Sequence, residues 1–294
     1  MVRSPATGQA YPLRWICAAL RVPRSSVYAA QRPRTAASGH RGPVPALSDA
    51  ALLTAVREDL AASPFTGEGH RKVRARLRRR AVPIRVSRER VRRVMGQAHL
   101  LAPYRVRRTH GHPAHDGTVI TGGPNQRWGT DGTTVMTAQE GRVWLFLTVE
   151  HWNSELLGWH VTTRGDRFAA LAAVQGAVHT VAGHLEPDAV RGVELRMDHG
   201  SQYTARDFRA GIRFWGLSAS YAFVGEPEGN GVAERMIGIL KEQVLAGRVF
   251  QDAAEVRAAV AVFIPCYNAD WLLARHGYRS PHEVRRALAT QVAA

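Results

Sequence analysis

Three carboxylates in the second half of the chain, on Asp131, Asp198 and Glu234, have sequence surroundings that could bring them together. Asp198 comes after the apolar residues Val193 and Leu195 and precedes a glycine turn, so we expect it at the end of a short buried strand. Asp131 stands where a polar, glycine-rich stretch passes into another predicted strand, and we expect a second strand-end acid there. Glu234 opens a helical run. Separate elements can hold three such side chains at one point.

These acids suit metal-assisted phosphodiester chemistry. Oxygen-only clusters bind hard cations such as Mg²⁺ or Mn²⁺, which keep open positions for water and phosphate. The 35 residues between Asp198 and Glu234 leave room for a helix, a strand and a loop. Two divalent metal ions about 4 Å apart can activate the attacking oxygen and neutralise the leaving one. Taken singly, each acid is more often a surface residue; taken together, the three predict catalytic residues that are also the metal ligands.

The positive charge of the protein is concentrated in its first 124 residues. The 294-residue chain has a net charge of +16; residues 1–124 hold 23 Arg and Lys against 6 Asp and Glu, whereas residues 125–294 hold 17 against 18. An excess placed so unevenly is typical of a region that binds a polyanion, and double-stranded DNA is the expected partner. A solvated basic surface is the alternative.

The chain has no feature of a membrane or secreted protein. It contains no run of about 18 apolar residues and no signal-peptide core, so we expect a cytoplasmic, nucleoid-associated protein with no membrane partner. Cys17 and Cys266 lie far apart without a Cys-x-x-Cys pattern, which favours reduced cysteines over a disulfide or a zinc site.

Three predicted helices in the basic part, at 47–60, 70–80 and 87–96, have one apolar face each, and Ser87 is placed to cap the third. We expect residues 47–103 to form a basic helix-turn-helix domain that contacts DNA phosphates, with an arginine-rich solvated bundle as the alternative. The candidate DNA contacts on these helices are Arg71, Lys72, Arg74, Arg88 and Arg92.

The segments around this domain are less specific. Residues 1–34 show two short helical patterns joined by a tight turn, which resembles a small helix-turn-helix but would fit any helical hairpin. Residues 35–46 and 104–124 are polar or rich in Pro and Gly, and we expect linkers there.

From residue 125 to 294 the pattern predicts an α/β catalytic core. Strands are expected at 128–136, 142–150, 155–163, 193–197 and 217–221, and helices at 168–182, 205–214, 231–246 and 253–267. Three antiparallel strands followed by alternating helices and strands is the order of the ribonuclease-H-like fold, a mixed five-stranded sheet covered by helices.

Lys241 follows Glu234 by seven residues, or two helical turns, so both side chains should project from one helix face. A cation there could hold the DNA backbone beside the metal site. A solvated lysine without a specific role fits the spacing equally well.

Several motifs resemble one family. They are Trp128-x-Thr-Asp131, the run Asp198-His-Gly-Ser-Gln-Tyr203, Asn230 four residues before Glu234, Lys241-Glu242, and the C-terminal run Arg275–Pro281. This set is similar to the integrase-core (DDE) transposases of bacterial insertion sequences, of the orfB type with a catalytic domain like that of retroviral integrases. The resemblance implies that Asp131, Asp198 and Glu234 are the metal-binding triad and that Asn230 and Lys241 contact DNA.

The resemblance also implies activity and partners. A member of this family would cleave and transfer DNA strands at the terminal inverted repeats of its element and insert them into target DNA, as a homo-oligomer on DNA. It would act as a fusion with, or beside, an upstream-frame orfA product. A catalytically inactive DNA-binding regulator is the non-enzymatic alternative. His276-x-x-Arg279 could suggest a tyrosine recombinase, but no tyrosine follows Arg279 as its nucleophile.

Overall fold

The computed structural model describes residues 2–3, 5–31, 46–103, 121–221 and 230–292. The chain divides into two compact units, Met1–Asp49 and Ala50–Ala294. Most of the two predicted linkers, 35–46 and 104–124, lies outside the described residues, and so does the loop 222–229 before the Glu234 helix.

The first unit contains two short strands and two short helices. Strand β1 (Val2–Arg3) pairs antiparallel with β2 (Ala10–Tyr11), and helices α1 (Leu13–Ala19) and α2 (Arg24–Gln31) follow. The helix pair agrees with the sequence pattern, whereas the strand pair was not expected. The helix-turn-helix assignment of residues 1–34 stays a prediction.

The second unit begins with the three expected helices, α3 (Asp49–Ala62), α4 (His70–Leu77) and α5 (Arg88–Gln97), and α4 and α5 are the two basic ones. Helix α4 ends three residues before the predicted end at Arg80. Ser87 caps α5 as predicted, because its side chain accepts the N–H of Arg90 at 3.2 Å. Their role as a separate DNA-binding domain stays a prediction.

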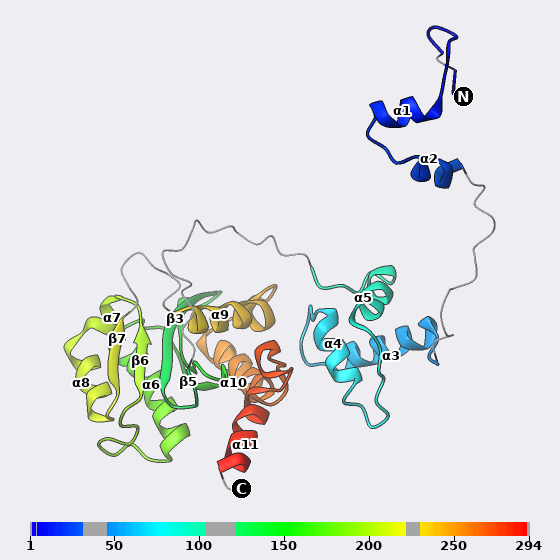
Figure 1. The fold of residues 1–294 in the computed structure, drawn as a ribbon. Coiled ribbons are helices and arrows are strands. Elements are labelled where there is room, and N and C mark those ends of the chain that lie inside the picture. The colour runs from blue at the N-terminus through cyan, green and yellow to red at the C-terminus, as the bar shows by residue number, and fades with distance from the viewer. Residues whose placement is uncertain (1, 4, 32–45, 104–120, 222–229, 293–294) are drawn as a thin grey trace. The chain divides into compact units, whose positions relative to one another are not determined.

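A five-stranded mixed sheet forms the centre of the second unit (Figure 1). Its strands are β3 (Arg127–Thr137), β4 (Gly141–Glu150), β5 (Leu156–Thr162), β6 (Glu194–Met197) and β7 (Ser218–Tyr221), in the order β5-β4-β3-β6-β7. Strands β3, β4 and β5 are antiparallel neighbours, whereas β6 pairs parallel with both β3 and β7. The predicted ribonuclease-H-like fold is confirmed.

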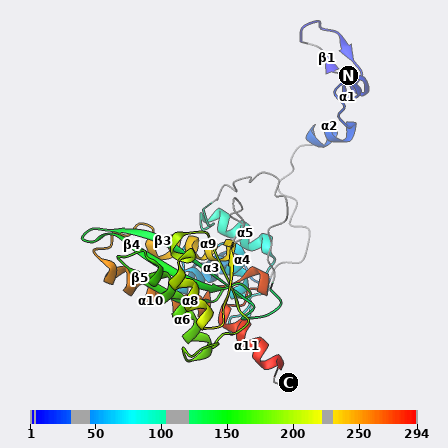
Figure 2. The ribbon, with the colours of Figure 1, turned by 90° about the vertical axis from the view of Figure 1, so that its left-hand side faces the viewer.

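Helices cover both faces of the sheet and bury a separate apolar cluster on each (Figures 1 and 2). Helices α6 (Arg167–Ala182) and α8 (Arg206–Phe214) contribute to one cluster, and α9 (Gly231–Leu240) and α10 (Ala253–Asp270) to the other. Helix α6 approaches β5 so closely that a methyl group on Gly158 would lie 2.1 Å from the carbonyl oxygen of Ala173.

The predicted helix 231–246 changes its winding at Lys241. The α-helical part ends at Leu240, and a π-helical turn, η2 (Lys241–Leu245), follows. The N–H of Ala246 donates to the carbonyl of Lys241 at 2.7 Å, which spans five residues instead of four. The expectation of one continuous α-helix was therefore wrong in its last turn.

Three further elements were not expected: α7 (Ser201–Thr204), η3 (Ala274–His276) and α11 (Pro281–Val292). Helix α10 also extends three residues past the predicted Tyr267, although it contains Pro265. Cys17 and Cys266 are free, as predicted. Within the described ranges, every helix is too short or too polar to span a membrane.

Candidate active site

Asp131 and Asp198 are brought together by the parallel pairing of β3 with β6. In this pairing Arg127 lies opposite Glu194 and Gly129 lies opposite Arg196. Continuing the same register by two residues places Asp131 beside Asp198, which directly follows the end of β6. The prediction for Asp131 needs correction, because it lies inside the eleven-residue strand β3 and not at a strand end. Of the two paired strands, only β6 ends at this level of the sheet, directly before Asp198.

Glu234 reaches the same region from the first turn of α9. Burial is the main reason that the pKa of Asp131 rises to about 6, and the charges of Asp198 and Glu234 raise it further. The pKa of Glu234 is also raised, first by burial and then by Asp198. The charge of Asp198 therefore acts on both Asp131 and Glu234, and the charge of Glu234 acts on Asp131.

Backbone amides already hold two of these carboxylates. The N–H of Gly132 donates to Oδ1 of Asp131 at 2.7 Å, and the N–H of Gly200 donates to Oδ1 of Asp198 at 2.8 Å. Asp131 is half-buried, whereas Asp198 and Glu234 are exposed. In the part of the chain that the structure describes, no three His, Cys, Asp or Glu side chains are grouped closely enough to hold a metal ion.

Lys241 is exposed and lies within electrostatic reach of the acids. Its positive charge lowers the pKa of Asp131, in opposition to Asp198 and Glu234. Its backbone N–H still donates to the carbonyls of Ile237 and Gly238 at the end of α9, so the π-helical turn begins only after the two α-turns that separate it from Glu234.

Asn230 lies in a different environment from the DNA contact that was expected. Its side chain is 3% exposed, and Nδ2 donates to the carbonyl of Thr130 at 2.9 Å. The residue therefore joins the start of α9 to β3 instead of facing solvent.

His151, in the turn after β4, was not singled out by the sequence. Its ring is 3% exposed, and burial, followed by the charges of Arg127 and Arg275, lowers its pKa to about 4. The ring is therefore neutral at neutral pH. No residue spacing indicated that His151 and Asn230 would lie together beside β3.

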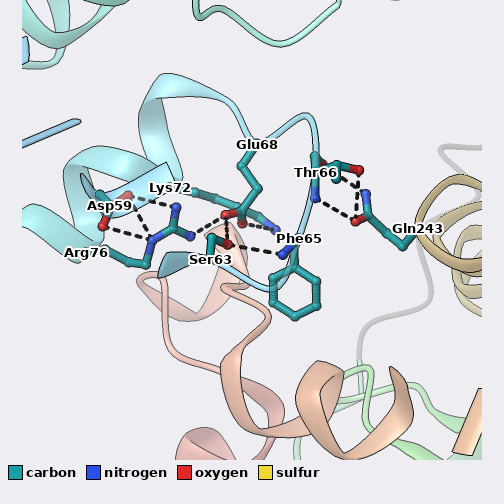
Figure 3. Close-up of polar contacts among 8 residues, drawn as sticks. All are labelled: Asp59, Ser63, Phe65, Thr66, Glu68, Lys72, Arg76 and Gln243. Atoms are coloured by element: carbon teal, nitrogen blue, oxygen red, sulfur yellow. Dashed lines mark hydrogen bonds and ion pairs between the residues drawn. The ribbon is translucent and has the colours of Figure 1, made fainter. Parts of the chain in front are cut away.

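Lys72, which Figure 3 shows beside Glu68, and Arg74 also differ from the expected DNA contacts. The ammonium of Lys72 lies 3.0 Å from the centre of the Trp271 ring and 3.4 Å from Glu68 Oε1. Arg74 donates from Nε to the carbonyl of Val86 at 3.0 Å. Both side chains therefore bind partners within the second unit.

Arg71, Arg88 and Arg92 remain exposed on α4 and α5. Arg88 and Arg92 donate from Nε to the two carboxylate oxygens of Glu89, at 3.1 and 2.8 Å. Such exposed pairs contribute little to stability, because water and salt screen them, so the two guanidinium groups can exchange Glu89 for another anion.

The basic helical region contacts the catalytic core through the loop before α4 (Figure 3). The backbone N–H of Thr66 donates to Oε1 of Gln243 at 2.9 Å, and Nε2 of Gln243 donates to the carbonyl of Thr66 at 3.0 Å. Gln243 lies in the π-helical turn, two residues after Lys241. The loop itself is held by Glu68, which accepts from Ser63 at 2.7 Å and pairs with Arg76 at 2.5 Å.

Comparison with known proteins gives family matches over the core. The integrase core domain family matches residues 122–227, and a second family of the same description matches residues 216–281. The chain is similar to the transposase InsD for insertion element IS2A/D/F/H/I/K of Escherichia coli, with 31% identity over 223 residues that cover 74% of this chain and 73% of that protein.

Solved structures with some likeness are integrases. The catalytic core domain of BIV integrase matches with a TM-score of 0.42 and 17% identity, over 57% of this chain and 99% of that one. A simian T-cell lymphotropic virus intasome in complex with PP2A regulatory subunit B56 gamma matches with a TM-score of 0.45 and 16% identity, over 70% of this chain and 68% of that one.

Proposed function

The chain belongs to the integrase-core (DDE) transposases of bacterial insertion elements, and we propose that Asp131, Asp198 and Glu234 are its catalytic triad. As a member of that family it is a polynucleotidyl transferase that acts on DNA. The observation that carries the triad assignment is the β3–β6 register, which places Asp131 beside Asp198, together with Glu234 in the first turn of α9, whose charge acts on Asp131.

The donor set fits a pair of Mg²⁺ or Mn²⁺ ions. It is made only of carboxylate oxygens, which hard divalent cations prefer, and its like charges would be relieved by a cation. When bound, such ions would polarise the scissile phosphate and activate the attacking water or 3′-hydroxyl.

The residues of the chain then have separate tasks. The amides of Gly132 and Gly200 orient the carboxylates of Asp131 and Asp198, so that their remaining oxygen atoms can serve as ligands. Glu234 supplies the third carboxylate from α9. Lys241, on the same helix face, is proposed to hold a DNA phosphate next to the scissile bond.

DNA binding is assigned to the basic region 47–103, with Arg71, Arg88 and Arg92 as exposed phosphate contacts. We propose three domains: a helical N-terminal segment at 1–34, a helix-turn-helix DNA-binding domain at 47–103 and the catalytic core at 125–294. The expected substrates are the terminal inverted repeats of an insertion element and a target duplex, bound by a homo-oligomer, alone or with the upstream-frame product.

The test is cleavage and strand transfer of terminal DNA with Mg²⁺ by Asp131→Asn, Asp198→Asn and Glu234→Gln. Each variant should lose both reactions while its gel shift stays at the wild-type value, because neutral side chains keep the shape and lose the ligand charge. Its melting temperature should not fall, since removing one of the like charges does not destabilise the fold. Glu186→Gln, at an exposed acid outside the site, should remain active. A wild-type protein that shifts DNA without ever cutting it would support the inactive regulator instead.

A further inference from the structure

A buried asparagine joins α9 to β3 next to Asp131. Nδ2 of Asn230 donates to the carbonyl of Thr130, the residue just before Asp131. Asn230 is also the residue that precedes α9, and an asparagine at that position usually accepts an N–H from the first turn of its own helix. Here the side chain makes no capping bond. The side-chain amide of Asn230 instead donates to the backbone of β3.

Strand β3 is shaped to receive this side chain. A methyl group on Gly129 would lie 2.8 Å from Oδ1 of Asn230 and 2.9 Å from Nε2 of His151. It would also lie 3.3 Å from Cβ of Ala233, which is fully buried in the first turn of α9. Helix and strand can approach this closely only because residue 129 has no side chain.

Stability does not explain a polar residue at this point. Oδ1 of Asn230 and both ring nitrogens of His151 are buried, and within the described ranges they have no hydrogen-bond partner. Buried polar atoms that lack a partner destabilise a fold, and such exceptions often mark sites of function. The asparagine therefore fits a geometric role better than a stabilising one.

We propose that Asn230 is a positioning residue of the active site: it fixes the first turn of α9, and with it Glu234, at a set distance from Asp131. The inference rests on the proposed catalytic role of these two acids. Glu234 lies one turn after Asn230, so a tilt of the helix start would move its carboxylate directly. Misplacement of a reacting group by about 1 Å can lower a rate a hundredfold.

Three substitutions in the full chain test this role from both sides of the contact. Asn230→Ala removes the side chain, Asn230→Asp keeps its shape but not the N–H donor, and Gly129→Ala pushes an intact Asn230 away. In each, we expect the single-turnover cleavage rate at saturating terminal DNA to fall by about tenfold to a hundredfold. The Kd for DNA should not change, and amide hydrogen exchange in residues 231–236 should become faster.

Two matched controls separate positioning from packing. Asn268 is 7% exposed and bonds to the N–H and the carbonyl of Leu156 at 3.0 and 2.9 Å, far along the chain from the acids. Asn268→Ala should lower the melting temperature but keep the cleavage rate of the folded protein. Gly238→Ala adds a methyl group to α9 where no atom lies within 4 Å. It should keep the cleavage rate and should not lower the melting temperature, because alanine favours a helix more than glycine does.

The possible results have distinct meanings. Weaker DNA binding with an unchanged rate at saturating DNA would make Asn230 a DNA contact and overturn the inference, as would wild-type kinetics in all three variants. Should the Asn230 variants not fold, Gly129→Ala decides alone. If the triad variants retain cleavage, the proposed function fails; if they lose it while the Asn230 and Gly129 variants do not, only the positioning role fails.

Discussion

The ring of Phe65 stands edge-on to the indole of Trp271, with 4.9 Å between the ring centroids and 84° between their planes. Phe65 also meets the ring of Phe263 edge-on, at 6.2 Å, and is only 4% exposed. Phe65 belongs to the loop before α4, whereas Trp271 follows α10. The basic region 47–103 therefore packs against the catalytic core through Phe65, whose side chain is part of a buried apolar cluster of the core.

This contact predicts a measurable coupling. Phe65→Ala should lower the free energy of unfolding by about 3–5 kcal/mol, because it removes a buried ring and leaves a cavity. In a double-mutant cycle with Trp271→Ala, the interaction energy should be about 0.5–1.5 kcal/mol, as for other edge-on aromatic pairs. Urea unfolding of the full chain measures both.

Phe214→Ala is the matched control for this cycle. The Phe214 ring is 52% exposed, so its loss should change the free energy of unfolding by less than about 0.5 kcal/mol. Strict additivity of Phe65→Ala and Trp271→Ala would show that the two rings do not stabilise each other.

Lys72 predicts an alkaline pH dependence of stability. Burial lowers its pKa from 10.5 to about 8, although Glu68 opposes this change; Arg76 and Arg235 lower the pKa further. Between pH 8 and 10.5 the unfolded chain binds this proton and the folded chain does not, so stability should rise with pH. Below pH 8 both states are protonated and this contribution is constant.

Unfolding free energies measured from pH 7 to 11 would reveal this rise, and Lys72→Met should remove it. Arg71→Met is the control, because it deletes a neighbouring charge that is exposed and not buried. An equal slope in the wild type and in Lys72→Met would mean that Lys72 keeps its proton in the folded protein.

The sheet order was predictable because each strand carries its own alternating or apolar pattern, and the order of strands and helices then allows few topologies. The position of Asp131 inside β3 was less clear. Glycines and threonines around it weaken the apolar alternation, so we expected it at a strand end, although the strand predicted at 128–136 already contained it. Pairing with β4 along its whole length keeps it extended.

Contacts between distant segments could not be predicted from local pattern. Phe65 is a single apolar residue in a stretch rich in Pro and Gly, which is typical of an exposed loop. The sequence 241–245 suits an α-helix as well as a π-helix. In the structure, η2 turns Gln243 toward Thr66 and buries Val244, and only tertiary packing could decide between the two.

The exposed arginines of α5 predict a change in the salt dependence of DNA binding. If Arg88 and Arg92 each neutralise one phosphate, Arg88→Ala and Arg92→Ala should each reduce the slope of log K against log[salt] by about 0.9. Binding isotherms at several salt concentrations measure this slope. Arg191→Ala, at a highly exposed arginine of the core, should leave the slope unchanged. A slope lost equally in all three variants would point to net charge alone and not to a binding face.

Lys241 separates DNA positioning from metal binding on one helix face. A charge-assisted contact to a phosphate beside the scissile bond is worth about 1.5–3 kcal/mol, so Lys241→Ala should slow cleavage of terminal DNA by roughly tenfold to a hundredfold. Lys241→Arg keeps the charge but not its point geometry, and its rate should fall between those of the wild type and the alanine variant.

The control for this series is Arg248→Ala, an exposed cation shortly after η2, which should cleave at the wild-type rate. All rates are compared on one terminal substrate at fixed Mg²⁺ and salt, so that only the side chain changes. Because Lys241 carries no ligand oxygen, the Mg²⁺ concentration for half-maximal cleavage should stay the same in the arginine variant. An alanine variant as fast as the wild type would make Lys241 an ordinary solvated lysine, and the DNA phosphate would need another partner.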